Sequence, residues 1–178
     1  MTATRYSLVP HPGSPAANVR SVAFELVDRL DDLLLRVVIA GQEHVRFPEI
    51  RAPGRVDGLW KTTCFELFLN PVGSDGYLEF NFSPSTEWAA YRFDGYRAGM
   101  RDFDIGAPPI IERAKPYAIE VVLDCGAIPD AACNMALSAV IEEIDGTKSY
   151  WALAHAPGAP DFHNRDCFIA TRPAVERP

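Results

Sequence analysis

The chain lacks long apolar runs, the common catalytic motifs and an excess of basic residues. Its longest apolar stretch, 33–40, is interrupted by Arg36, whereas a membrane-spanning helix needs about 20 consecutive apolar residues. Walker, GxGxxG and GxSxG patterns do not occur in the sequence, so nucleotide chemistry and acyl transfer lack support. The 17 Lys and Arg against 24 Asp and Glu give a net charge of −7. We therefore expect neither nucleic acid nor a membrane as a partner.

Cysteine is scarce and widely spaced. Cys64, Cys125, Cys133 and Cys167 form no CxxC pair, so the ligand pattern of a structural zinc site is missing. The first 20 residues contain no apolar segment of the kind found in signal peptides. We therefore expect a cytoplasmic location, where thiols stay reduced, and four thiols outside disulfides.

Helical periodicity is weak throughout the chain. The 15 Pro and 12 Gly divide it into short segments, which suits strands joined by turns. The length of 178 residues predicts one domain, 1–178, with a substantial core. Period-2 alternation and apolar runs predict strands at 20–27, 33–40, 63–69, 77–83, 88–93, 110–113, 117–123, 135–143, 149–154 and 167–171. We expect an all-β, antiparallel, jelly-roll-like sandwich of about ten to eleven strands.

The segment 58–100 carries polar residues where a sheet core would be apolar. Side chains alternate across a strand, so three neighbouring strands are predicted to share one apolar face made of Phe65, Leu67, Leu69, Leu78, Phe80, Phe82, Ala89, Tyr91 and Phe93. The opposite face, which we call the mixed face, is then predicted to carry Trp60, Glu66, Glu79, Asn81, Trp88 and Arg92.

The mixed face suits a small polar ligand such as a saccharide. Aromatic rings stack on the C–H surfaces of such a ligand, and its hydroxyls need hydrogen-bond partners. We interpret Trp60 and Trp88 as stacking platforms. Glu66, Glu79 and Asn81 would orient hydroxyls, and Arg92 would balance charge or contact an anionic group. A purely structural interpretation uses the same residues, as an ion pair of Arg92 with a glutamate beside packing tryptophans.

The strings WKTTCFELFLNP and YLEFNFSPSTEWAAYRFDGYR carry a family resemblance. The positions that carry it are Trp60, Glu66, Tyr77, Glu79, Phe80, Asn81, Ser83 and Pro84. The chain resembles the DOMON-like domains related to family 9 carbohydrate-binding modules, and its closing string HAPGAPDFHNRDCFIATR is similar to the end of small bacterial single-domain members. The resemblance implies a ten- to eleven-stranded antiparallel β-sandwich that binds a sugar, a haem or another small ligand. Neither an Asp-rich calcium loop nor a haem-ligand spacing of Met100 and His155 is found, so no cofactor is predicted.

Catalytic alternatives stay open at this point. Glu66 and Glu79 on adjacent strands could serve a glycoside hydrolase, although Arg92 on the same face would oppose the raised pKa that a general acid needs. His155, Asp161, His163 and Asp166 mix imidazole and carboxylate groups, as transition-metal sites do, yet a capping loop explains the same residues. A third class is a protein-interaction module that uses an exposed sheet edge. The sequence assigns no catalytic residue, ligand identity or oligomeric state.

Overall fold

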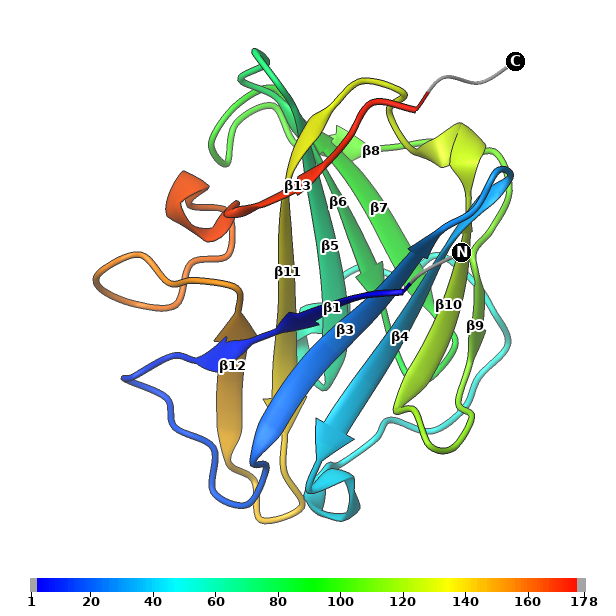
Figure 1. Cartoon of the computed structure of the whole chain (residues 1–178). Helices are drawn as coiled ribbons and strands as arrows, with labels where there is room; N and C mark the ends of the chain where they lie inside the picture. Colours follow the sequence, from blue (N-terminus) through cyan, green and yellow to red (C-terminus); the bar gives the residue numbers. More distant parts are fainter. Residues whose placement is uncertain (1–2, 176–178) are drawn as a thin grey trace.

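The computed structural model describes residues 3–175, which form two antiparallel β-sheets facing each other (Figure 1). The five-stranded sheet has the order β1-β3-β4-β10-β9. Its strands are β1 (Thr4–Ser7), β3 (Ser21–Asp28), β4 (Asp32–Ala40), β9 (Ile110–Glu112) and β10 (Ile119–Asp124). The structure is therefore an all-β sandwich, as predicted.

The eight-stranded sheet has the order β2-β12-β11-β5-β6-β7-β8, with β13 paired to β11. Its strands are β2 (Val9–Pro10), β5 (Cys64–Pro71), β6 (Tyr77–Phe82), β7 (Trp88–Phe93), β8 (Arg101–Asp102), β11 (Cys133–Glu142), β12 (Lys148–Ala152) and β13 (Ala170–Arg172). All ten predicted segments overlap a strand. The three further strands, β1, β2 and β8, are two to four residues long and too short to give a periodic signal.

The main core lies between the two sheets. Strand alternation turns Leu67 of β5 and Phe80 of β6 toward Phe24 and Leu35 of the five-stranded sheet, and all four are almost fully buried. The rings of Phe24 and Phe65 meet edge to face with centroids 6.3 Å apart, an arrangement that aromatic pairs favour.

The register of β7 corrects the sequence-based assignment of faces. Residues directly opposite each other in an antiparallel pair point to the same side, and Trp88 lies opposite Phe82 while Arg92 lies opposite Leu78. Trp88 therefore belongs to the core between the sheets, where it is 7% exposed. The prediction that Trp88 and Arg92 share a face with Glu79 is wrong. Both alternating sets of 88–93 contain apolar residues, so hydrophobicity alone could not choose between them.

The connection between β6 and β7 sets this register. Residues 83–87 form a tight turn in which Ser83 N–H donates to the Glu87 carbonyl and Thr86 N–H donates to the Ser83 carbonyl. Thr86 takes a left-handed conformation with φ 78°. A turn that ends at Glu87 leaves Trp88 as the first residue to pair with Phe82.

The face of the eight-stranded sheet turned away from the five-stranded sheet is called the outer face here. A second apolar cluster covers part of it, with Cys64, Phe68, Tyr77, Tyr91 and Phe93 from the strands. Leu59, Phe162, Cys167 and Phe168 pack on these residues from segments outside the strands. The outer face is therefore roofed in part by the chain itself, along the 153–168 segment drawn in orange in Figure 1.

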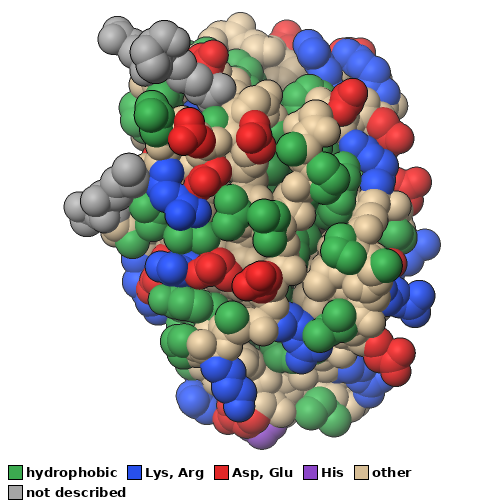
Figure 2. Space-filling view, turned by 90° about the vertical axis from the view of Figure 1, so that its right-hand side faces the viewer, with side chains coloured by type: hydrophobic (Ala, Val, Ile, Leu, Met, Phe, Trp, Pro, Cys, Tyr) green, Lys and Arg blue, Asp and Glu red, His purple; other side chains and the backbone are tan. Residues whose placement is uncertain are grey.

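On the side shown in Figure 2, acidic and basic side chains are interspersed among apolar ones. Within residues 3–175, no helix has the length and apolar character needed to cross a membrane. All four cysteines are buried thiols, and no disulfide joins them in the described part of the chain.

We expect Trp88→Ala to lower the free energy of unfolding by roughly 3–5 kcal/mol, because it empties a large site in the core between the sheets. Arg92→Ala should change it by less than about 0.5 kcal/mol, because that side chain is exposed. Urea unfolding followed by circular dichroism measures both. Equal effects of the two substitutions would contradict the observed register of β7.

Candidate functional site

A cavity of about 550 Å³ opens on the outer face, and we call it the outer-face cavity. This volume lies within the roughly 300–1,000 Å³ typical of small-molecule sites. The sheet supplies its floor with Glu66, Glu79, Tyr91, Phe93, Val140 and Tyr150. Segments outside the strands supply its walls with Ser14, Trp60, Arg97, Met100, Pro160, Phe162 and His163. The cavity is thus bounded by five strands, β5, β6, β7, β11 and β12, and by segments distant in sequence.

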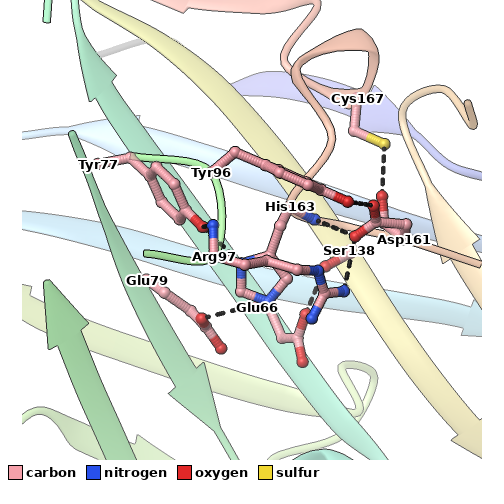
Figure 3. A network of polar contacts seen from close by, with 9 residues as sticks. All are labelled: Glu66, Tyr77, Glu79, Tyr96, Arg97, Ser138, Asp161, His163 and Cys167. Atoms are coloured by element: carbon pink, nitrogen blue, oxygen red, sulfur yellow. Dashed lines mark hydrogen bonds and ion pairs between the residues drawn. The ribbon is translucent and has the colours of Figure 1, made fainter. Parts of the chain in front are cut away.

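Two glutamates lie in the floor. Glu66 of β5 is paired with Asn81, and Glu79 of β6 is paired with Phe68, so the two glutamates are diagonal neighbours on one face. They are 3% and 5% exposed. Ser138 Oγ donates to Glu66 Oε2 at 2.8 Å, and Asn81 Nδ2 donates to Glu79 Oε1 at 2.9 Å. These bonds fix the orientation of both carboxyl groups, and Figure 3 shows the one between Ser138 and Glu66.

The floor favours protonated carboxyl groups near neutral pH. Burial and, to a lesser extent, the neighbouring charge of Glu79 together raise the pKa of Glu66 to about 8, against the opposing effect of the hydrogen bond from Ser138. Burial also raises the pKa of Glu79 to about 7, although the Asn81 hydrogen bond and the Arg97 charge act in the opposite direction. Carboxyl groups in this range can exchange protons with a bound ligand.

A hydrogen-bonded chain runs along one wall. Arg97 N–H donates to the Tyr77 hydroxyl at 3.3 Å, and that hydroxyl lies 2.7 Å from His163 Nδ1. We assign the Tyr77 proton to the bond with Nδ1, which leaves the imidazole proton on Nε2. Nε2 lies 3.8 Å from Glu79 Oε2. Burial, helped by the Arg97 charge, lowers the pKa of His163 to about 4, so the ring is neutral at pH 7.

Asp161 joins two loops over this wall. The Tyr96 hydroxyl donates to its Oδ2 at 2.5 Å, and the Arg97 guanidinium donates to its Oδ1 at 2.7 Å. His163 N–H also donates to Oδ1, at 3.2 Å. The loop after β7 and the 153–168 segment are therefore tied together beside the glutamates (Figure 3).

Trp60 lies in the wall and remains 53% exposed. It belongs to a short 3-10 helix, Leu59–Lys61, that follows Gly58 at φ 74°. A left-handed conformation of this kind favours glycine. Leu59 is buried under the helix, which anchors it to the outer face and leaves the Trp60 ring accessible.

The structure brings together three of the six residues that the sequence nominated. Trp60, Glu66 and Glu79 line the outer-face cavity. Asn81 is completely buried and acts through its hydrogen bond to Glu79. Trp88 and Arg92 lie on the other side of the sheet, so the predicted ion pair between Arg92 and a glutamate does not form.

Several cavity residues were missed by sequence reasoning. Tyr91 and Phe93 were assigned to the core because they are apolar. Ser138 offered a signal, since it is a polar residue inside the apolar strand 135–141. Arg97 and Phe162 come from loops, and no local pattern indicates where a loop returns to a sheet.

The candidate metal ligands are dispersed among different contacts. His163 bonds to Tyr77 and Asp161 bonds to Arg97, whereas the His155 Nε2 atom lies 2.9 Å from the Val9 carbonyl oxygen. Within residues 3–175, no three His, Cys, Asp or Glu side chains gather as a metal site requires. The expectation that the chain needs no cofactor stays a prediction.

Comparison with protein families and with curated proteins finds no match. A solved structure from Bacteroides uniformis, described as that of a "putative carbohydrate-binding protein", superimposes with a TM-score of 0.68 at 16% sequence identity. The match covers 95% of this chain and 85% of the other. The two proteins share a fold. At this identity the likeness extends to the fold alone.

The buried glutamates should make stability fall as pH rises from 6.5 to 8.0. Their carboxyl groups keep protons in the folded state that the unfolded chain, with ordinary pKa values, has already released, so raising the pH favours unfolding. The expected loss is about 2 kcal/mol from both groups together. His163 does not contribute between pH 6.5 and 8.0. Because its pKa is lowered in the folded state, the unfolded chain takes up the proton first, and stability is lost only as the pH falls below about 6.5.

Urea unfolding at pH 6.5 and 8.0 measures this loss, with the double substitution Glu66→Gln and Glu79→Gln as comparison. The free energy of unfolding of that variant should not change between the two pH values, because the two glutamines cannot ionise. Glu112→Gln, at an exposed position of β9, serves as the matched control and should keep the wild-type slope. A wild-type profile that is flat or rises across the window would contradict the assigned pKa directions.

Proposed function

We propose that this chain is a non-catalytic binding module for a saccharide, which it takes into the outer-face cavity. The observation that carries the proposal is the presence, around one cavity, of an exposed tryptophan and two buried, oriented carboxyl groups. Saccharides present both C–H surfaces and hydroxyls, so their recognition needs rings and hydrogen-bonding groups side by side.

Each group has a distinct role in the proposal. Trp60 stacks on a sugar ring at the accessible wall, and Glu66 and Glu79 orient hydroxyls at the floor, as hydrogen-bond donors when protonated and as acceptors when ionised. Asn81 and Ser138 position these two carboxyl groups and do not contact the ligand. Tyr91, Phe93, Tyr150 and Phe162 exclude water around it, which strengthens the polar contacts.

The fold likeness supports the same proposal at a coarser level. The structure from Bacteroides uniformis with a similar fold is described as that of a "putative carbohydrate-binding protein", and the resemblance to DOMON-like and family 9 carbohydrate-binding domains implies a sugar, a haem or another small ligand. The residues of the cavity, and not the likeness, carry the argument for this chain.

Glycoside hydrolysis is the second candidate function, favoured by one observation. Arg92, which would have kept a carboxylate ionised, lies on the opposite side of the sheet from Glu66 and Glu79. The two carboxyl groups differ in environment, because the Arg97 charge acts on Glu79, and glycosidases likewise place an acid and its partner in different environments.

Trp60→Ala should weaken saccharide binding by about 2 kcal/mol, or roughly 30-fold, because it removes the stacking surface. The ligand is first found with an array of mono- and oligosaccharides, and isothermal titration calorimetry then measures its affinity. Trp60→Phe keeps an aromatic surface and should retain most of the affinity. Failure of every saccharide to bind, or equal affinity in Trp60→Ala, would exclude the proposal.

Release of 4-nitrophenol from a panel of 4-nitrophenyl glycosides separates the two candidates. A binding module gives no turnover above background. Turnover that disappears in both Glu66→Gln and Glu79→Gln would establish hydrolysis in place of simple binding.

A further inference from the structure

We propose that the ligand of the outer-face cavity carries a primary amine beside its hydroxyls, as an amino sugar does, and that this amine binds between Glu66 and Glu79. The inference rests on the proposed function and narrows it to one class of saccharide. It follows from two features of the cavity floor in the described part of the chain: carboxyl oxygens without a hydrogen-bond donor, and no free positive charge beside them.

Each glutamate uses one carboxyl oxygen within the protein and leaves the other for a ligand. Ser138 donates to Oε2 of Glu66, and Asn81 donates to Oε1 of Glu79. Within the described residues, no hydrogen-bond donor meets Glu66 Oε1, and the nearest cationic-type atom to Glu79 Oε2 is His163 Nε2 at 3.8 Å. An ionised carboxylate can accept about four hydrogen bonds. The floor therefore offers acceptors that lack donors.

The positive groups near the floor are already committed or neutral. Arg97 lines the cavity, and its charge lowers the pKa of Glu79, but its guanidinium forms an ion pair with Asp161 at 2.7 Å. His163 is neutral because burial lowers its pKa. Because an uncompensated buried carboxylate costs several kcal/mol, burial favours the protonated form of both glutamates in the free protein. An ammonium group on the ligand stabilises the ionised form, and the carboxyl proton is released to solvent, whereas a neutral ligand gives no such stabilisation.

Aromatic rings add to the attraction for a cation. Five rings line the cavity, those of Trp60, Tyr91, Phe93, Tyr150 and Phe162. The face of an aromatic ring attracts a positive charge. Aromatic cages alone would also suit a quaternary ammonium group, but that group has no N–H. A primary ammonium has three N–H donors, so it can donate to both free carboxyl oxygens at once.

The test compares amino sugars with their neutral parents. Glucosamine, galactosamine and mannosamine are titrated into the full chain at pH 7.5 beside glucose, galactose and mannose, with choline as a quaternary ammonium probe. In each pair that binds, the amino sugar should bind at least about tenfold more tightly, since charge-assisted hydrogen bonds are roughly twice as strong as neutral ones. Choline should bind more weakly than the amino sugar.

Substitutions assign the preference to the two glutamates. Glu66→Gln and Glu79→Gln keep an acceptor oxygen but remove the charge, so each should reduce the ratio between amino and neutral sugar toward one. Glu112→Gln, on β9 of the other sheet, should leave the ratio unchanged. Thermal unfolding of each variant confirms that it is folded.

The outcomes separate this inference from the proposed function. A neutral sugar that binds as tightly as its amino partner, or a ratio unaffected by both glutamine variants, overturns the amine assignment and leaves saccharide binding intact. Tighter binding of choline overturns the requirement for N–H donors. Failure of every saccharide, in this panel and in the array of mono- and oligosaccharides, to bind overturns both.

Discussion

The pairing of β5, β6 and β7 is the constraint on which the core and the cavity both depend. With Phe65 opposite Phe82 and Phe82 opposite Trp88, the odd and even positions of the three strands are sent to opposite sides. One set fills the space between the sheets. The other set brings Glu66, Glu79 and Tyr91 to the same surface. A slip of one residue at the turn 83–87 would exchange the two sets along β7.

The outer face combines an apolar cluster with a buried acidic pair, and each makes the other possible. Phe68, Tyr77 and Phe93 exclude water from the floor, and this exclusion raises the pKa values of Glu66 and Glu79. The glutamates in turn are tolerated because Ser138 and Asn81 satisfy one oxygen of each. The polarity left unsatisfied faces the cavity, so the energetic cost of burial is concentrated where a ligand can relieve it.

The architecture was predictable from the sequence, and the cavity only in part. Turn residues and period-2 alternation identified ten strand segments. The segments 63–69 and 77–83 pointed to Glu66 and Glu79, because a charged residue in an apolar strand is costly to bury and therefore indicates a specific role. Trp88 and Arg92 were misplaced because 88–93 is apolar on both sides, and the deciding information lay in the turn before it. Arg97 and Phe162 could not be found, since loop positions depend on tertiary contacts.

The cavity has two parts of different origin, a floor made of strands and a wall that includes two loops joined by Asp161. The floor is made of strands whose other side fills the core between the sheets, so its residues are constrained by the stability of the whole sandwich. The loop with Tyr96 and Arg97 and the segment with Phe162 and His163 lie outside that core, and Arg97 itself is half exposed. Substitutions in these loops can therefore change the shape of the wall while the acidic floor and the fold stay the same.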